Sequence, residues 1–337
     1  MKYLAYFFAL MYGFSCTTPE GKISGEYLGQ KLPGNSPELF APGIINDGIA
    51  TRDITFTPDG KEIYFCKNTA NSTYSTILFC KETNEGWSEP EVLSFAQNSE
   101  FIFIEPFISP DGLKLFFVSN KGNNFTEANR FITDIWVVER ENDFWGEPYK
   151  LDSIINSIDS EFFPSVAENG NLYFARENAK NREGFIYKSE LKNGKYQKPE
   201  KLPIQINAGA ARFNAVITKD ESFMIVPIYG IEDSRGSTDY YITFYDKEKG
   251  WSQPQNMGDK INTKSGNEYS ANFSPDGKYF FFMSSRTENK NEGLLSYKTL
   301  QRIHNSPGNG NSNIYWMKAD FINVLKEKAT YIKNEEK

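Results

Sequence analysis

The sequence predicts an all-β protein, a single β-propeller of five repeats. Aromatic side chains make up 15% of the 337 residues, with 28 Phe and 19 Tyr. This enrichment is typical of pleated, half-buried strands. A Pro-Asp-Gly turn or a degenerate form of it recurs along the chain, and a period of about 50 residues is a signature of propellers. The turns end at Gly60, Gly112, Gly170, Glu221 and Gly277, which gives spacings of 52, 58, 51 and 56 residues.

Each turn is predicted to join two strands. Pro fixes φ at the first turn position and Asp-Gly tolerates the rest of the turn geometry, so strand, tight turn and strand follow one another. The strands predicted after the turns cover 62–66, 114–118, 171–175, 222–226 and 279–283. A third strand is predicted in each repeat at 77–80, 135–138, 185–187, 240–244 and 314–317.

The fourth strand is indicated by an aromatic residue followed by Pro, at 86–90, 144–148, 194–199 and 250–254. Pro is tolerated there because the outermost strand of a blade is an edge. Four strands a repeat, arranged radially, make a propeller. The last repeat lacks its outer strand and continues into 319–325, which looks helical. An unmatched strand at 37–45 precedes the first repeat, so we expect it to close the last blade; six blades remain the alternative.

The amino terminus resembles an export signal. Lys2 precedes an apolar run over 3–14, which is too short to span a bilayer and is typical of a signal peptide. The segment 13–16, Gly-Phe-Ser-Cys, resembles the lipobox of bacterial lipoproteins, although Gly13 stands where Leu is usual. The resemblance implies that Cys16 becomes the lipidated first residue; a plain secretory signal cut near Ser15 is the alternative.

These features divide the chain into four parts. We expect a signal peptide at 1–15, a lipid-anchored tether at 16–36, the propeller at 37–326 and a C-terminal tail at 327–337. The protein would then be exported and anchored to the bacterial envelope, facing the periplasm or the cell surface.

The repeat itself resembles a known family. The pattern Pro-Asp-Gly-Lys-x-Ile/Leu-Tyr/Phe-Phe is similar to the WD40-like repeat of the Tol-associated periplasmic propeller and its lipoprotein relatives. The segments 27–34 and 40–44 resemble the start of exported lipoproteins in that group. The resemblance implies the fold and says little about function, because one fold hosts many sites.

Composition and motifs exclude several classes of function. The net charge is −7 with scattered Lys and Arg, so no basic stripe for nucleic acid is present. The single His304, in a stretch predicted to be a solvated loop, cannot form a multi-histidine metal site. No nucleophile elbow or phosphate loop occurs, and no cofactor is expected. Cys66 and Cys80 lie on predicted strands; we favour free thiols, with a disulfide as the alternative.

A candidate site follows from the repeat register. The residues nine positions before the end of each turn are expected to ring the mouth of the central channel, and they are Thr51, Phe103, Glu161, Arg212 and Glu268. Glu161, Arg212 and Glu268 could pair with one another, an arrangement that is more often structural than catalytic. Because glycosidases need only two carboxylates, a carbohydrate-active enzyme using paired carboxylates at the axis stays the alternative.

Long loops add a second indication. The connections between second and third strands are long at 120–133, 229–238 and 285–312, on the expected face of the channel mouth. Binding usually resides in such loops on a rigid scaffold, although they are also tolerated as plain insertions. We therefore predict a monomeric, non-enzymatic envelope protein that binds a protein, peptide or glycan. The predicted ligand-binding residues are Glu161, Arg212, Glu268, Phe125, Arg130, Tyr229, Asp233, Arg235 and Arg286.

Overall fold

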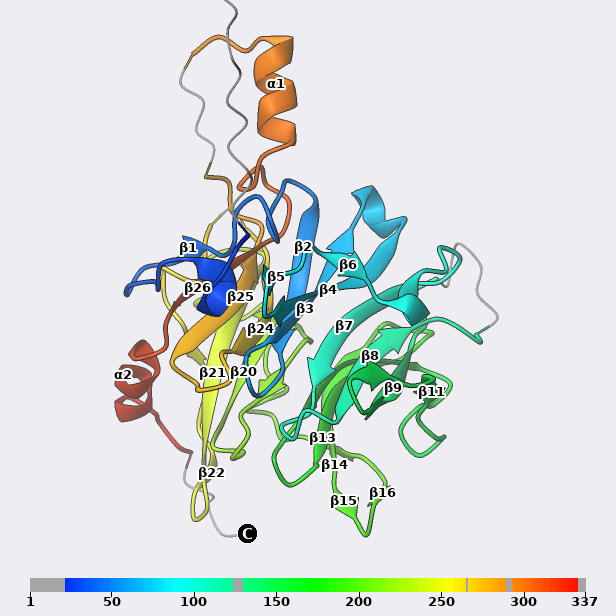
Figure 1. Cartoon of the computed structure of the whole chain (residues 1–337). Coiled ribbons are helices and arrows are strands. Elements are labelled where there is room, and N and C mark those ends of the chain that lie inside the picture. Colours follow the sequence, from blue (N-terminus) through cyan, green and yellow to red (C-terminus); the bar gives the residue numbers. More distant parts are fainter. Residues whose placement is uncertain (1–21, 124–129, 265, 289–292, 333–337) are drawn as a thin grey trace, which may run out of the picture.

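The chain forms a five-bladed β-propeller (Figure 1). The computed structural model describes residues 22–123, 130–264, 266–288 and 293–332. Each blade is an antiparallel sheet, and in the first four blades the strands follow one another in sequence from the axis outward. This confirms the predicted fold and the predicted number of blades.

The strands have the following bounds. The first blade contains β2 (Ala50–Phe56), β3 (Glu62–Asn68), β4 (Ser75–Thr83), β5 (Gly86–Trp87) and β6 (Glu91–Val92). The second contains β7 (Phe103–Ile108), β8 (Lys114–Ser119), β9 (Asp134–Glu141), β10 (Phe144–Trp145) and β11 (Tyr149–Lys150). The third contains β12 (Ser160–Val166), β13 (Leu172–Glu177), β14 (Gly184–Ser189) and β17 (Glu200–Lys201), with a separate hairpin of β15 (Leu191–Lys192) and β16 (Lys195–Tyr196).

The remaining blades complete the ring. The fourth contains β18 (Ala211–Arg212), β19 (Val216–Ile217), β20 (Phe223–Tyr229), β21 (Thr238–Asp246), β22 (Gly250–Trp251) and β23 (Gln255–Asn256). The fifth contains β24 (Glu268–Phe273), β25 (Tyr279–Ser284), β26 (Asn313–Lys318) and β1 (Glu38–Leu39). The short 3-10 helices are η1 (Glu26–Gly29), η2 (Ala70–Ser72) and η3 (Ser94–Ala96). The α-helices are α1 (Tyr297–His304) and α2 (Phe321–Glu327).

The ring is closed by the amino-terminal strand, as predicted. β1 pairs antiparallel with β26, with Leu39 opposite Tyr315. The next residue, Phe40, is fully buried, and its ring centroid lies 5.0 Å from that of Phe281 and 5.1 Å from that of Trp316. The last blade is therefore built from both ends of the propeller sequence.

The predicted turns are held by their Asp side chains. In the first blade, Asp59 accepts hydrogen bonds from the Thr57 hydroxyl at 2.6 Å and from the Lys61 backbone N–H at 3.1 Å. The same pair of contacts recurs at Asp111 and Asp276. Such Asx turns explain why Asp is repeated at this position.

A repeated Ile-Asn dipeptide supports the third strand of four blades. In the third blade, the Asn207 side chain accepts from the Ile186 backbone N–H at 2.8 Å and donates to the Ile186 and Leu202 carbonyls. Equivalent side chains in the other three blades do the same, and they are Asn46, Asn156 and Asn262. Each buried amide takes the place of a ladder partner where the outer strand is short.

Hydrophobic clusters lie between neighbouring blades. Tyr64 of the first blade packs in one cluster with Phe116 of the second, and Tyr173 of the third packs in another with Met224 of the fourth. Since each blade buries its faces only against its neighbours, the five blades form one cooperative unit.

The helices and cysteines bear on three predictions. The segment expected to be helical near 319–325 overlaps α2, where Ile322 packs against the fifth blade. The stretch around His304 was predicted to be a loop, but it lies in α1, which begins at a Ser296 N-cap. Cys66 and Cys80 are free and buried, as favoured. Among the described residues, no helix has the length and apolar character needed to cross a bilayer.

Candidate functional site: the axial pocket

The innermost strand of every blade is distorted at the same place. One residue in each repeat has a positive φ between 46° and 64°, and these residues are Asp53, Glu105, Phe163, Asn214 and Ser270. The ladder register shifts at this point in four blades, and in the fourth blade the strand is split into β18 and β19. Bulges of this kind re-aim side chains and are frequent next to functional sites.

The bulge residues and Arg52 meet in a polar network. The Arg52 guanidinium donates to Glu105 Oε1 at 2.6 Å, and its Nε lies 2.7 Å from Asp53 Oδ2. Glu105 Oε2 accepts the backbone N–H of Phe163 at 2.6 Å. Asn214 Nδ2 donates to Ser270 Oγ at 3.0 Å and lies 3.5 Å from Glu105 Oε1. Groups from all five blades are therefore joined near the axis.

Burial sets the electrostatics of this network. It raises the pKa of Glu105 to about 7, against the opposing effect of the Arg52 charge, and the Asp53 charge adds to the rise. Burial likewise raises the pKa of the Cys66 thiol, with a further contribution from Asp53. The Arg52 guanidinium also lies over the Tyr269 ring, 4.9 Å from its centroid. Glu105 can hold a proton near neutral pH, whereas Arg52 stays charged between two carboxyl groups.

A pocket of about 260 Å³ lies next to this network, and Arg52, Glu105 and Asn214 form part of its lining. Its aromatic lining consists of Phe131, Phe162, Phe213 and Tyr269. Its charged lining consists of Arg52, Glu105, Glu177 and Arg182, and the last two form an ion pair of 2.9 Å. Burial raises the pKa of Glu177. We call this cavity the axial pocket.

The strand positions predicted for the channel mouth lie one residue away from those that line it. Thr51, Phe103, Glu161, Arg212 and Glu268 do not line the axial pocket, whereas the following residues, Arg52, Ile104, Phe162, Phe213 and Tyr269, all do. Successive side chains of a strand point to opposite faces, so a one-residue error exchanges the two sets.

The three predicted charged residues have other partners and do not pair with one another. Glu161 accepts from Arg176 Nε at 2.6 Å, and burial raises its pKa. Arg212 donates to the carbonyls of Ala208, Gly209 and Gly184. Glu268 accepts from the Thr263 and Ser284 hydroxyls, and burial raises its pKa as well. Neither Glu161 nor Glu268 lines the axial pocket, whereas the predicted glycosidase pair would have to flank a substrate site together.

The predicted loop residues that the structure describes also lie outside the axial pocket. Arg130 donates to the Thr73 carbonyl, Asp233 accepts from the Tyr241 hydroxyl at 2.7 Å, and Arg235 donates its backbone N–H to Asp239. Tyr229 is half exposed at the end of β20. Arg286 donates to the carbonyls of Lys260 and Ile261. Phe125 lies outside the described residues.

The predicted face is nevertheless the one that carries the pocket. Phe131 and Thr133 come from the long connection of the second blade, and Arg182 comes from the corresponding connection of the third. The residues that sequence reasoning missed include Asp53 and Glu105, which stand at equal distances before their Pro-Asp-Gly turns. That shared spacing was the available signal.

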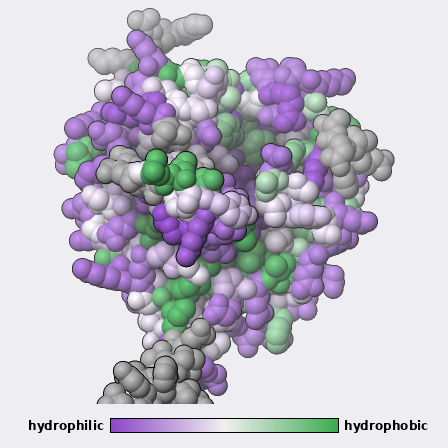
Figure 2. Space-filling model, turned by 90° about the horizontal axis from the view of Figure 1, so that it is seen from above, coloured by the Kyte–Doolittle hydropathy of each residue, from purple (hydrophilic) through white to green (hydrophobic). Residues whose placement is uncertain are grey.

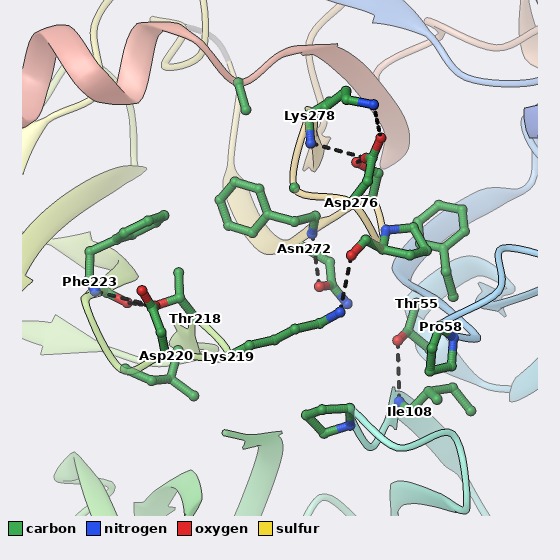
Figure 3. Close-up of a pocket in the computed structure, with 18 of the residues that line it drawn as sticks. Thr55, Pro58, Ile108, Thr218, Lys219, Asp220, Phe223, Asn272, Asp276 and Lys278 are labelled. Atoms are coloured by element: carbon green, nitrogen blue, oxygen red, sulfur yellow. Dashed lines mark hydrogen bonds and ion pairs between the residues drawn. The ribbon is translucent and has the colours of Figure 1, made fainter. Parts of the chain in front are cut away.

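A second pocket of about 520 Å³ opens at the turns, on the opposite side of the network (Figure 3). Lys219 extends across it and donates to the Pro275 carbonyl at 3.1 Å. Asp276 accepts from Ser274 and Lys278, and Thr55 Oγ1 accepts from the Ile108 backbone N–H. The axial pocket is the better candidate site, because it combines four aromatic rings with the strained bulge residues Glu105 and Asn214.

Metal binding has no support in the described part of the chain. There, no three His, Cys, Asp or Glu side chains are grouped so that they could hold a metal ion. The axial carboxyl groups of Asp53 and Glu105 have Arg52 as their shared cation instead.

No family model matches the chain. No curated protein matches it either. Among solved structures, the chain is similar to a native arabinanase of Bacillus subtilis, with a TM-score of 0.50 and 12% identity, over 85% of this chain and 99% of that one. It is also similar to an exo-β-1,3-galactanase from Clostridium thermocellum, with a TM-score of 0.46 and 13% identity, over 90% of this chain and 62% of that one.

A hydrazine synthase of Kuenenia stuttgartiensis matches with a TM-score of 0.38 and 15% identity, over 68% of this chain and 62% of the synthase chain. The chain thus spans less than two thirds of the synthase and galactanase chains. At these identities the arabinanase likeness shows the propeller fold alone.

Proposed function

We propose that the axial pocket binds a glycan without cleaving it. One observation carries this proposal: a single cavity combines four aromatic rings with hydrogen-bond donors and hydrogen-bond acceptors. Aromatic faces pack against the C–H faces of sugar rings, while carboxylate, amide and guanidinium groups exchange hydrogen bonds with hydroxyls.

The paired charges of the pocket favour binding of a neutral ligand over a charged one. Two guanidinium groups, Arg52 and Arg182, face two carboxyl groups, Glu105 and Glu177, and each cation is already paired. A strongly anionic or cationic ligand would have to break one of these pairs. A polyhydroxylated ligand can bind between them without doing so.

The size of the pocket favours the end of a glycan chain. A volume of about 260 Å³ is slightly below the usual range for small-molecule pockets, about 300 to 1,000 Å³. One terminal sugar therefore fits inside, and the rest of the chain would leave over Phe131 and Arg182.

A glycan array followed by calorimetry tests the proposal. We expect Phe213→Ala to weaken binding about tenfold, because it removes one ring of the pocket. Tyr229→Ala is the control, since this exposed aromatic residue lies on the same blade but outside the pocket. Absence of glycan binding by the wild-type protein, or loss of binding in the control alone, would contradict the proposal.

A carbohydrate-active enzyme is the second candidate, and one observation favours it. Glu105 and Glu177 line one cavity, and burial raises the pKa of both, as a general acid requires. Binding is preferred because Glu105 uses both oxygens within the network and Glu177 is paired with Arg182. Release of reducing sugar by the wild-type protein, abolished in Glu105→Gln, would establish the enzyme instead.

The envelope location belongs to the proposal as well. The lipobox resemblance at 13–16 supports export and lipidation at Cys16, residues that lie outside the described part. Mass spectrometry of the native amino terminus tests this, with an acylated Cys16 expected at the start of the mature chain. An unmodified start at another residue would refute lipidation and leave the glycan proposal untouched.

A further inference from the structure

The connection between β25 and β26 forms an arm that projects from the propeller. Its described parts are 285–288 and 293–312, with α1 near its outer end. The two sides of the arm meet in a β-bridge between Thr287 and Asn309, and the Glu288 N–H donates to the Gly308 carbonyl at 3.0 Å. In Figure 1, α1 stands clear of the blades at the top of the molecule.

The base of the arm is fixed to the loop before the first blade. Asn309 and Asn311 donate their side-chain amides to the Gly48 carbonyl, at 3.2 and 2.9 Å. Gly48 has φ 102°, and a Cβ there would lie 2.7 Å from the backbone carbon of Asn305. This close backbone approach holds the arm in a defined direction.

The outer end of the arm exposes large apolar side chains. Leu294 is 98% exposed, Leu295 63%, Tyr297 77% and Leu300 49%, and no residue of α1 is buried. Tyr297 and Leu300 are three residues apart and lie on one face of the helix. Apolar side chains gathered on a projecting tip indicate an interaction surface.

The same tip is basic. Lys298 and Arg302 are both exposed and lie four residues apart, and the tip 293–304 contains no Asp or Glu. The chain as a whole has a net charge of −7, so this segment differs in sign from the rest. Figure 2 views this side from above and shows a hydrophobic patch next to a hydrophilic one where the arm projects.

We propose that the tip of the arm, 293–304, inserts shallowly into the surface of an anionic lipid bilayer. Leu and Tyr side chains beside Lys and Arg make up the composition of interfacial anchors, in which the apolar groups enter the acyl boundary and the cations contact lipid phosphates. The tip is convex, which suits a deformable bilayer; a protein partner would need a preformed groove to cover it. This surface is distinct from the axial pocket and does not depend on the glycan proposal.

A polarity-sensitive fluorophore at the tip tests insertion directly. The full chain carries Cys16→Ser in all samples, and the dye is attached at Leu294→Cys. Cys66 and Cys80 are fully buried and burial raises the pKa of both thiols, so they stay unlabelled in the folded protein. The control dye site is Phe144→Cys, 78% exposed on the outer edge of the second blade, which reports contact of that part of the propeller with the bilayer.

We expect vesicles containing phosphatidylglycerol to shift the emission of the dye at position 294 to shorter wavelength and to leave the dye at 144 unchanged. Lys298→Glu together with Arg302→Glu should reduce the vesicle partition coefficient at least 25-fold, at about fivefold for each lost cation. This coefficient is obtained by titrating lipid and following the fraction of shifted dye. Both side chains are exposed, so the fold and glycan binding should persist.

Two results would overturn the proposal. A dye at position 294 that stays in water on vesicles of every composition would show that the tip does not enter bilayers, and a protein partner would then be the occupant to seek. An equal shift in the charge-reversed variant would show that the cations do not contribute.

Discussion

Glu105 is the residue on which the axial network depends most. It reaches the first blade through Arg52, the third through the Phe163 N–H and the fourth through Asn214. Its backbone also adopts a positive φ, which is unfavourable for Glu. A strained residue with a raised pKa is retained where the surrounding structure or the function requires it.

The raised pKa of Glu105 predicts a pH dependence of stability. Between the ordinary carboxyl pKa of 4.5 and about 7, the folded protein holds a proton that the unfolded chain has released. The free energy of unfolding therefore falls as pH rises through this window, by at most ~3 kcal/mol. Thermal unfolding of wild type and Glu105→Gln at pH 4.5 to 7.5 checks this. The difference in midpoint, wild type minus variant, should decrease with pH, and a constant difference would contradict the assignment.

Glu221 shows how the fourth repeat, whose turn departs from Pro-Asp-Gly, keeps the turn conformation. It stands where the other four turns have Gly and adopts φ 57°. Its carboxylate accepts from Asn169, Asn171 and the Tyr173 hydroxyl of the third blade. The backbone strain is thus offset by contacts between blades.

We expect Glu221→Gly to lower the free energy of unfolding by ~1 to 3 kcal/mol. Relief of the positive φ contributes about 1 kcal/mol, but the buried Tyr173 hydroxyl and the Asn171 amide lose their acceptor. Chemical denaturation measures the change. Asn193→Gly is the control, because Asn193 also has a positive φ of 51° but lies in an exposed hairpin turn, and it should change stability little. A stabilised Glu221→Gly would mean that strain outweighs the contacts.

At the scale of elements, periodicity was sufficient to place the blades. Pro-Asp-Gly turns have a local mechanism, and Trp87, Trp145 and Trp251 mark the outer strands. Periodicity did not predict which side chains of the inner strands point to the axis. The bulge at Asp53 and its equivalents changes the strand register, and no turn residue marks it in the sequence. The Ile-Asn repeat was readable but lies in segments that look like loops.

The Ile-Asn repeat yields a prediction for a single strand. Asn207→Ala should lower the free energy of unfolding by ~2 to 4 kcal/mol, because it leaves the N–H and carbonyl of buried Ile186 without their partner. Asn181→Ala, at an exposed position of the same blade, is the matched control. Equal stability of the two variants, measured by urea denaturation, would show that the amide is dispensable.

For the whole molecule, ring closure makes the first and last blades one unit. Phe40 contacts Phe281 and Trp316 of the fifth blade, and its ring centroid lies 6.5 Å from that of Phe56 in the first. Closure was predictable because the strand count left one unmatched strand at each end. The function was less predictable, since it depends on side chains that meet only after five distant segments have come together.

Phe40→Ala should destabilise the entire propeller by ~3 to 5 kcal/mol and leave unfolding as one transition. Phe144→Ala, at an exposed site, should have little effect. Differential scanning calorimetry distinguishes the outcomes. A separate early transition for the last blade would mean that closure does not couple the blades.

The pairing of β1 with β26 also sets the order of events during folding. Leu39 and Tyr315 are neighbours in space but lie at opposite ends of the propeller sequence, so the ring cannot close until the chain has been made or translocated almost to its end. Until then, β1 lacks its partner and can pair with another chain. A chain that emerges amino terminus first therefore passes through a state in which β1 is present and its pairing partner is not.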